Sequence, residues 1–208
     1  MHTVVVRVWM PDRPGALGQV ASRIGAVRGD LLGIEILEVG AGRAVDELVV
    51  ALPDADLVDL MVNEVHAIDG VSVEHVRAID VEHVDRSVLT LALAADLAES
   101  TPGTRVERLV EGVVAITDAD WALCTSGDRL LVATDGAPSP EWVASLVAGS
   151  RHLDGDTMLS SDLFWVELPT AGCWVAAGRS DRPIHDRERR LLAYFARVAD
   201  ALLEPIGP

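Results

Sequence analysis

The first part of the chain alternates between two hydrophobic periods, and each period predicts one kind of element. In residues 3–9 (TVVVRVW), β-branched side chains alternate with period two, which predicts a β-strand. From Gly15 to Arg28, apolar residues instead recur every three or four positions, which predicts a helix with one apolar face. The same two periods predict strands at 31–39 and 44–52, a helix at about 54–70 and a strand at 71–79.

The resulting order of strand, helix, strand, strand, helix and strand is that of a ferredoxin-like βαββαβ domain. Residues 40–43 contain two glycines and are short enough to join the two central strands as a hairpin. We therefore expect an α+β chain whose first domain occupies residues 1–85.

The second half of the chain has a different order of elements. It predicts helices at 87–98 and 104–116, a hairpin of strands at 120–126 and 129–134, a helix at 139–149, strands at 162–168 and 173–178, and a last helix from about Asp186 to Leu203. We expect residues 86–208 to form a second α+β domain with an antiparallel sheet and terminal helices.

The composition excludes several classes of function. Half of the 208 residues are hydrophobic, which is enough for one sizeable core or two small ones and excludes disorder as the main state. The formal net charge is −16, so we expect no nucleic-acid partner. All basic residues are arginine, and the lack of lysine excludes phosphate-loop NTPases, protein kinases and pyridoxal-phosphate enzymes.

The cysteines and the apolar runs indicate where the protein resides. Cys124 and Cys173 lie in strand-like apolar runs without Cys-x-x-Cys spacing, so we expect two reduced thiols in the core. The first residues lack the pattern of a secretory signal, and the longest apolar runs reach about eight residues, against roughly 20 for a membrane helix. We expect a cytoplasmic protein without membrane contact.

A short duplication, Val-Glu-His-Val, occurs at 73–76 and again at 81–84. Its Glu/His pairs are of a type that ligates metals, but neighbouring residues on a strand point to opposite faces. We therefore expect solvated side chains there, and no metal or other cofactor in the protein.

The most informative stretch is Asp12-Arg13-Pro14-Gly15-Ala16-Leu17, between a predicted strand and the helix that follows it. A helix N-terminus offers unpaired N–H groups and a positive dipole to a carboxylate, and Gly15 allows close approach to the main chain. The Asp12 carboxylate complements an ammonium group, so the pair suits the zwitterion of an amino acid. The alternative is that Asp12 caps the helix and residues 14–15 form a turn.

With these residues and this order of elements, the first domain resembles an ACT domain, a small-molecule-binding regulatory module attached to many enzymes of amino-acid metabolism. The resemblance covers about residues 3–80 and implies a non-catalytic domain that binds an amino acid, commonly at a dimer interface. The family often places an Asn or Asp after a glycine and an aliphatic residue, whereas here Asp30 follows Gly29 directly and Leu31 stands at the polar place. The candidate ligand-binding residues are Asp12, Arg13, Gly15, Ala16, Leu17 and Asp30.

The second domain is similar, more weakly, to a GAF domain. This resemblance rests on residues 162–203, where two strands precede a long terminal helix that opens with Asp186-Arg187-Glu188. Two features there have more than one interpretation. An arginine-rich segment either binds an anion or partner or is a solvated helix face: Arg179, Arg182, Arg187, Arg189, Arg190 and Arg197. Four tryptophans either pack in the core or line an apolar pocket: Trp121, Trp142, Trp165 and Trp174.

We therefore expect a regulatory protein that binds a free amino acid or similar metabolite, has no catalytic output and signals to an unidentified protein partner. The alternative is a dimerisation or protein-interaction module with vestigial ligand sites, and an enzyme of another type comes third. A homodimer is expected because the strand 31–39 (LLGIEILEV) lies at a sheet edge, is apolar and carries only two charges.

Overall fold

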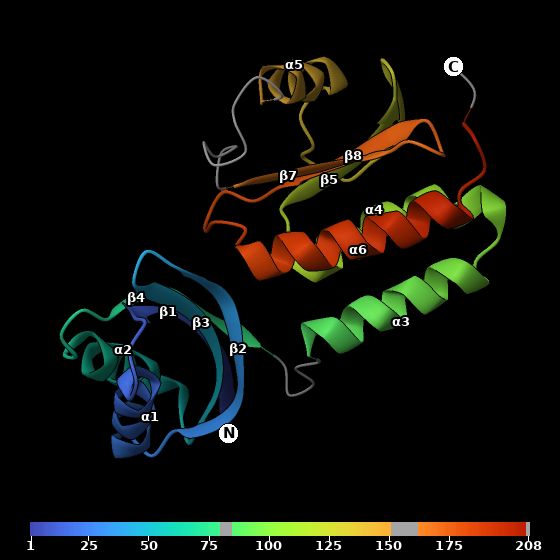
Figure 1. Cartoon of the computed structure of the whole chain (residues 1–208). Coiled ribbons are helices and arrows are strands. Elements are labelled where there is room, and N and C mark those ends of the chain that lie inside the picture. The colour runs from blue at the N-terminus through green and yellow to red at the C-terminus, as the bar shows by residue number, and fades with distance from the viewer. Residues whose placement is uncertain (80–84, 151–161, 207–208) are drawn as a thin grey trace. The chain divides into compact units, whose positions relative to one another are not determined.

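The computed structural model describes residues 1–79, 85–150 and 162–206. The chain divides into two compact units, Met1–His83 and Val84–Pro208, which are called the N-terminal and C-terminal domains below (Figure 1). Each domain has its own sheet and its own hydrophobic core.

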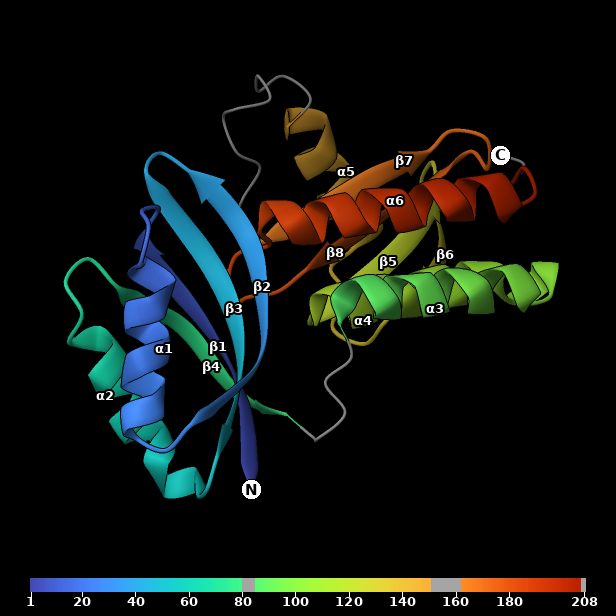
Figure 2. The same cartoon turned by 60° about the horizontal axis from the view of Figure 1, so that its bottom comes forward.

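The N-terminal domain is a four-stranded antiparallel sheet with both of its helices on one face (Figure 2). Its strands have the order β2-β3-β1-β4, which confirms the ferredoxin-like prediction and places β2 at an edge. The elements are β1 (His2–Pro11), α1 (Ala16–Ala26), β2 (Asp30–Gly40), β3 (Arg43–Leu52), a 3₁₀ turn (Ala55–Leu57), α2 (Val58–His66) and β4 (Ser72–Ile79).

The core of this domain follows from the period-two pattern of its strands. The even positions of β1 and β3 pack against the buried face of α1, which carries Ala16, Val20 and Ile24. The return from α1 to β2 is tight, since a Cβ at Gly29 would lie 2.7 Å from Cγ2 of Ile24. The second helix is less regular than the sequence predicts, because a 3₁₀ turn precedes it and Leu60 stays 47% exposed.

The odd positions of the central strands are buried as well, and they carry charge. Arg7 and Glu47 are opposite each other in the β1–β3 register, each is 1% exposed, and Arg7 Nε donates to Glu47 Oε2 at 2.7 Å. If either side chain of such a buried pair is removed, the charge of the other stays buried without compensation, and the folded state is destabilised.

The C-terminal domain is a second antiparallel sheet, of order β6-β5-β8-β7. Helices α3, α4 and α6 lie on one face of the sheet and α5 on the other (Figures 1 and 2). In chain order the elements are α3 (Arg86–Glu99), a 3₁₀ turn (Pro102–Thr104), α4 (Arg105–Thr117), β5 (Trp121–Ser126), β6 (Arg129–Ala133), α5 (Pro140–Ser150), β7 (Leu163–Leu168), β8 (Cys173–Gly178) and α6 (Asp186–Leu202).

The main core of the C-terminal domain lies between the sheet and its three helices. Phe195 of α6 packs on Gly112 of α4, where a Cβ would lie 2.4 Å from the ring. Cys124 and Cys173 are both free and buried there, as the sequence predicts. A hydrogen bond with Cys173, together with burial, raises the pKa of the Cys124 thiol.

The tryptophans gather on the opposite face of the same sheet. Trp121, Trp165 and Trp174 pack against a small cluster that includes Val143 of α5. Trp142 instead remains 51% exposed. Three of the four tryptophans of this domain therefore contribute to packing.

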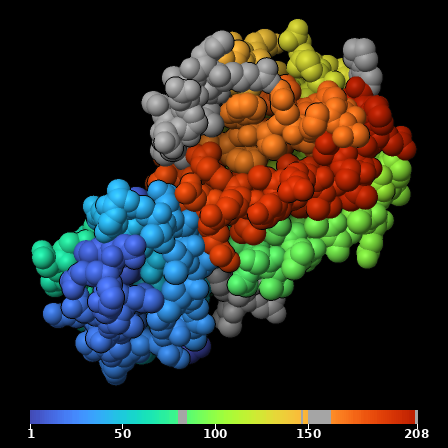
Figure 3. Space-filling model, viewed as in Figure 1, coloured from blue at the N-terminus to red at the C-terminus, as the bar shows by residue number. Residues whose placement is uncertain are grey.

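The arginine-rich segment divides into two parts: Arg190 and Arg197 are exposed on α6, as a solvated helix face requires, whereas the two arginines before the helix are buried. Arg179 and Arg182 are buried, and the two terminal nitrogens of Arg179, Nη1 and Nη2, donate to Oε1 and Oε2 of Glu188. Arg182 pairs with Asp118 at 3.3 Å and with Asp181 at 2.5 Å. These charges hold the start of α6 to the end of α4, so their role is structural. The outer face of α6 is at the surface, alongside α3 (Figure 3).

Among the described residues, no helix is both long enough and apolar enough to span a bilayer.

Candidate functional site

The turn between β1 and α1 is fixed by backbone hydrogen bonds. The Asp12 N–H donates to the carbonyl oxygen of Gly42 at 2.9 Å, and the Ala16 N–H donates to that of Arg13 at 3.2 Å. This holds residues 12–15 beside the β2–β3 hairpin. In the space-filling view, α1 and this hairpin lie next to each other on one face of the domain (Figure 3).

The helix begins at Ala16, two positions later than Pro14 would suggest. Gly15 is the N-cap, and its φ of 87° lies in the left-handed region that glycine adopts without strain. A Cβ at Gly15 or at Gly18 would meet no atom within 4 Å, so the space above the first turn is open. Along the described chain, no residue accepts a hydrogen bond from the N–H of Leu17 or Gly18.

Asp12 does not cap this helix. Its side chain is exposed, and the N-cap has no side-chain hydrogen bond. The capping alternative from the sequence is therefore wrong, and the positive end of α1 is left to another acceptor.

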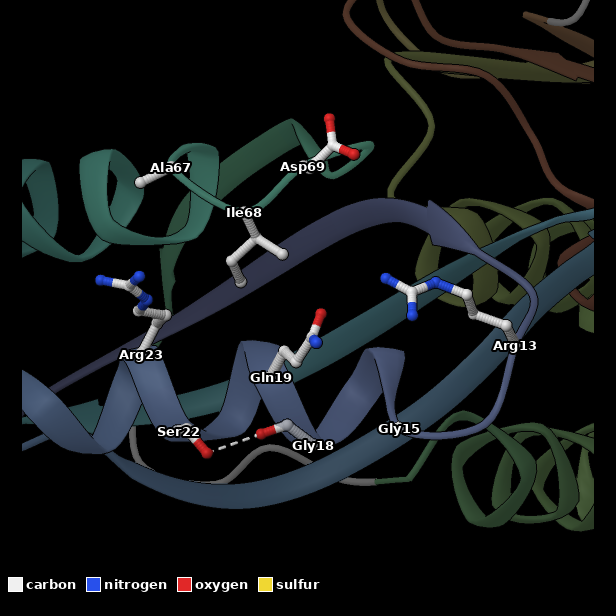
Figure 4. Close-up of a pocket in the computed structure, with 9 residues that line it drawn as sticks. All are labelled: Arg13, Gly15, Gly18, Gln19, Ser22, Arg23, Ala67, Ile68 and Asp69. Carbon is white, nitrogen blue, oxygen red and sulfur yellow. Dashed lines mark hydrogen bonds between the residues drawn. The ribbon is translucent and has the colours of Figure 1, made fainter.

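A groove runs along α1 from this end, with a cavity volume of about 560 Å³ (Figure 4). Arg13 lies at one end of the groove, and Asp69, after α2, lies on its opposite wall above Ile68. Groups of both charges thus border the groove. It is lined by Arg13, Gly15, Gly18, Gln19, Ser22, Arg23, Ala67, Ile68 and Asp69.

The structure brings five of the six predicted residues together, and Asp30 is not among them. Asp12, Arg13, Gly15, Ala16 and Leu17 all fall within the six-residue stretch 12–17 around the start of α1, although Ala16 itself is buried in the core. Asp30 pairs with Ala51, at the end of the sheet opposite to the Pro11–Arg43 pair that precedes Asp12. Within one chain, Asp30 therefore does not complete this site.

Asp46 of β3 is the charged residue that the sequence analysis missed. It is 4% exposed, and burial, followed by the charge of Asp12, raises the pKa of its carboxyl group. The sequence did contain a signal, because Asp46 interrupts an otherwise apolar face made by Ala44, Leu48 and Val50.

The Glu/His pair of β4, Glu74 and His75, is half-buried. Glu74 accepts a hydrogen bond from Trp9 Nε1 at 2.9 Å, and no group of three or more potential metal ligands occurs in the part of the chain that the structure describes. The second copy of the motif, at 81–84, lies outside the described residues.

Comparison with known protein families gives a match in the N-terminal domain. Residues 4–70, from β1 to the turn after α2, match the ACT domain. ACT domains are regulatory modules that bind small molecules, so the class of this domain agrees with its sheet order and its open helix end. No curated protein matches the chain.

Solved structures similar to this chain include two of domain size and one of similar length. An uncharacterized protein from Thermotoga maritima is 22% identical, with 38% of this chain and 96% of that chain covered and a TM-score of 0.31. The ACT domain from GTP pyrophosphokinase of Chlorobium tepidum is 15% identical, with 38% and 100% covered and a TM-score of 0.31. An unknown protein from Galdieria sulphuraria is 15% identical, with 96% and 92% covered and a TM-score of 0.35. The expected GAF-like character of the C-terminal domain is not confirmed.

Proposed function

We propose that this protein is a non-catalytic regulator that binds a free amino acid at the start of α1 and passes its state to a protein partner. The observation that carries the proposal is the open positive end of α1, where the N–H groups of Leu17 and Gly18 have no acceptor among the described residues. A ligand α-carboxylate suits these groups and the nearby Arg13. Asp12 supplies the opposite charge for the α-ammonium.

A panel of amino acids in a thermal-shift assay tests this function. A ligand that binds only the native state stabilises it by RT ln(1 + [L]/Kd), about 2.7 kcal/mol at a hundredfold excess over Kd. Turnover of a panel member would instead favour an enzyme.

Asp12→Ala is expected to weaken binding of the amino acid found in this way by about 1.5–3 kcal/mol, because a charge-assisted hydrogen bond is lost. The fold should persist, since the Asp12 side chain is exposed. Calorimetry measures the affinity, and Asp96→Ala, an exposed aspartate of the C-terminal domain, is the matched control. Equal affinity of Asp12→Ala and wild type would remove Asp12 from the site.

A second candidate function, a dimerisation module, is favoured by the apolar edge of the N-terminal sheet. Leu32, Ile34 and Ile36 are exposed side by side on β2, at 48–54%. Pairing β2 with itself about a two-fold axis near Glu35 would cover them and satisfy the edge. It would also bring Asp30 of the partner subunit close to Gly40, at the end of the sheet where Asp12 lies. The dimer and the ligand site are therefore compatible.

Ile34→Lys is expected to shift the protein from dimer to monomer at micromolar concentration, because it places a charge on the pairing strand. Leu91→Lys, on an exposed position of α3, should leave the dimer intact. Light scattering measures the molar mass of each variant and so distinguishes a monomer from a dimer. A monomeric wild type, with and without amino acid, would contradict edge pairing.

For the C-terminal domain we keep a GAF-like role as a proposal. Its support is the order of its elements and the small apolar cluster between α5 and the sheet, away from the main core.

A further inference from the structure

A second cavity lies in the C-terminal domain, at the end of its sheet where β5 begins and β8 ends. Its volume is about 480 Å³, within the range of small-molecule sites. One wall comes from α5, which lies on the face of the sheet opposite the other three helices (Figures 1 and 2). The lining includes two tryptophans and two aspartates: Trp121, Trp142, Asp120 and Asp162.

The two tryptophans give this cavity aromatic walls. The indole of Trp121 lies against Gly178 at the end of β8, where a Cβ would lie 2.6 Å from Cζ2 of the ring, so only glycine leaves room for it. Trp142 of α5 is 51% exposed, whereas the next residue, Val143, is buried in the small cluster on the sheet. Val143 therefore holds α5 to the sheet, and half of the Trp142 side chain stays accessible at the cavity.

The charged side chains at the cavity are predominantly acidic. Oδ2 of Asp120 accepts two hydrogen bonds of 2.8 Å, from the N–H and from the hydroxyl of Ser180, which fix this carboxylate at the rim. Asp162 belongs to the same lining. The one arginine among the described lining residues, Arg179, directs its guanidinium to the buried carboxylate of Glu188, which compensates its charge there.

Aromatic rings and carboxylates together suit an organic cation. The face of an indole attracts a positive charge, and it also offers an apolar surface to methyl and methylene groups. A divalent metal ion takes six or more oxygen ligands and gains nothing from the rings, and the described part of the chain holds no group of three or more potential metal ligands. A neutral apolar ligand would cover the rings but would leave the carboxylates without a counter-charge.

We propose that this cavity binds a small organic ammonium cation in which the nitrogen is methylated. The cation lies against the indoles of Trp121 and Trp142, with the carboxylate of Asp120 beside it. Methyl groups contact the rings and carry part of the charge, whereas a primary ammonium has three N–H groups that each need an acceptor. The site lies in a different domain from the start of α1 and does not depend on the function proposed there.

The test uses the full chain and two probes of the same shape, choline and its neutral isostere 3,3-dimethyl-1-butanol. Calorimetry measures the affinity of both probes for wild type, Trp142→Leu and Asp120→Asn. Both variants should fold, because Trp142 is half exposed and asparagine keeps an oxygen that can accept from Ser180. The matched controls are Tyr194→Leu, at a tyrosine of α6 that is 57% exposed, and Asp128→Asn, at an exposed aspartate between β5 and β6.

We expect the wild type and both controls to bind choline about tenfold more tightly than the neutral isostere, because only the cation is attracted by the rings and the carboxylates. Trp142→Leu and Asp120→Asn should each lose most of this preference. Equal affinity of the wild type for the two probes, or binding of neither at millimolar concentration, would overturn the proposal. A preference that both variants retain would also overturn it. Each of these results leaves amino-acid binding at α1 untouched.

Discussion

Glu188→Ala is expected to lower the free energy of unfolding of the C-terminal domain by about 3–5 kcal/mol, because it leaves a buried guanidinium without its carboxylate. Arg179 and Glu188 are both 0% exposed and joined by hydrogen bonds of 2.7 and 3.0 Å. Glu188 Oε2 also accepts the N–H of His185 and so completes the capping box of α6. The substitution removes both interactions at once.

Urea unfolding followed by tryptophan fluorescence measures this loss, since four of the five tryptophans lie in the C-terminal domain. Glu111→Ala is the matched control, because Glu111 pairs with Arg108 on the surface, where both are more than half exposed. It should change the free energy of unfolding by about 0–1 kcal/mol. If both variants lower the free energy of unfolding equally, the buried pair contributes no more to stability than the surface pair.

Glu47→Ala is expected to destabilise the N-terminal domain by a similar amount, about 3–5 kcal/mol. It leaves Arg7 without the carboxylate that lies 2.7 Å from its Nε in the centre of the sheet. Hydrogen exchange of peptides from β1 and β3, read by mass spectrometry, localises the loss to this domain.

Glu64→Ala is the control for this second variant. Its ion pair with Arg23 has the same distance, 2.7 Å, but is 33–48% exposed, so we expect a change of about 0.2–1 kcal/mol. Unchanged exchange in β1 and β3 of Glu47→Ala would contradict the role assigned to the Arg7–Glu47 pair.

Most of the fold could be predicted from the sequence because each element carries a clear hydrophobic period. The alternation in residues 3–9 and 44–52 gives strands that are adjacent in the sheet, and the glycines after Val39 mark the hairpin. The start of α1 was less predictable. Pro14 is common at the first position of a helix, but here it lies in the turn, and the left-handed Gly15 sets the boundary.

The pattern of residues along the sequence could not show which charged side chains are buried. Arg179 and Glu188 are nine residues apart in a segment rich in charged residues, and they are buried only because the connection from β8 to α6 packs against the end of α4. Arg7 and Glu47 are likewise charged residues within apolar strands, and only the β1–β3 register shows that they pair.

The candidate site was predicted where it depends on consecutive residues and missed where it depends on packing. Asp12 to Leu17 are neighbours along the chain, so their meeting at the helix start is local. Asp46 lies opposite Val8 of β1, and its burial becomes visible only with the β1–β3 pairing. Asp30, predicted from its position after a glycine, lies at the other end of the sheet of its own chain.

The central claim is that an amino acid binds at the start of α1, and backbone amide chemical shifts of the ¹⁵N-labelled protein test it most directly. Titration with the amino acid that gives the largest thermal shift should change the amide chemical shifts of residues 12–19 saturably, with those of Leu17 and Gly18 among the largest changes. Shifts confined to the C-terminal domain, or none at millimolar amino acid, would contradict the claim.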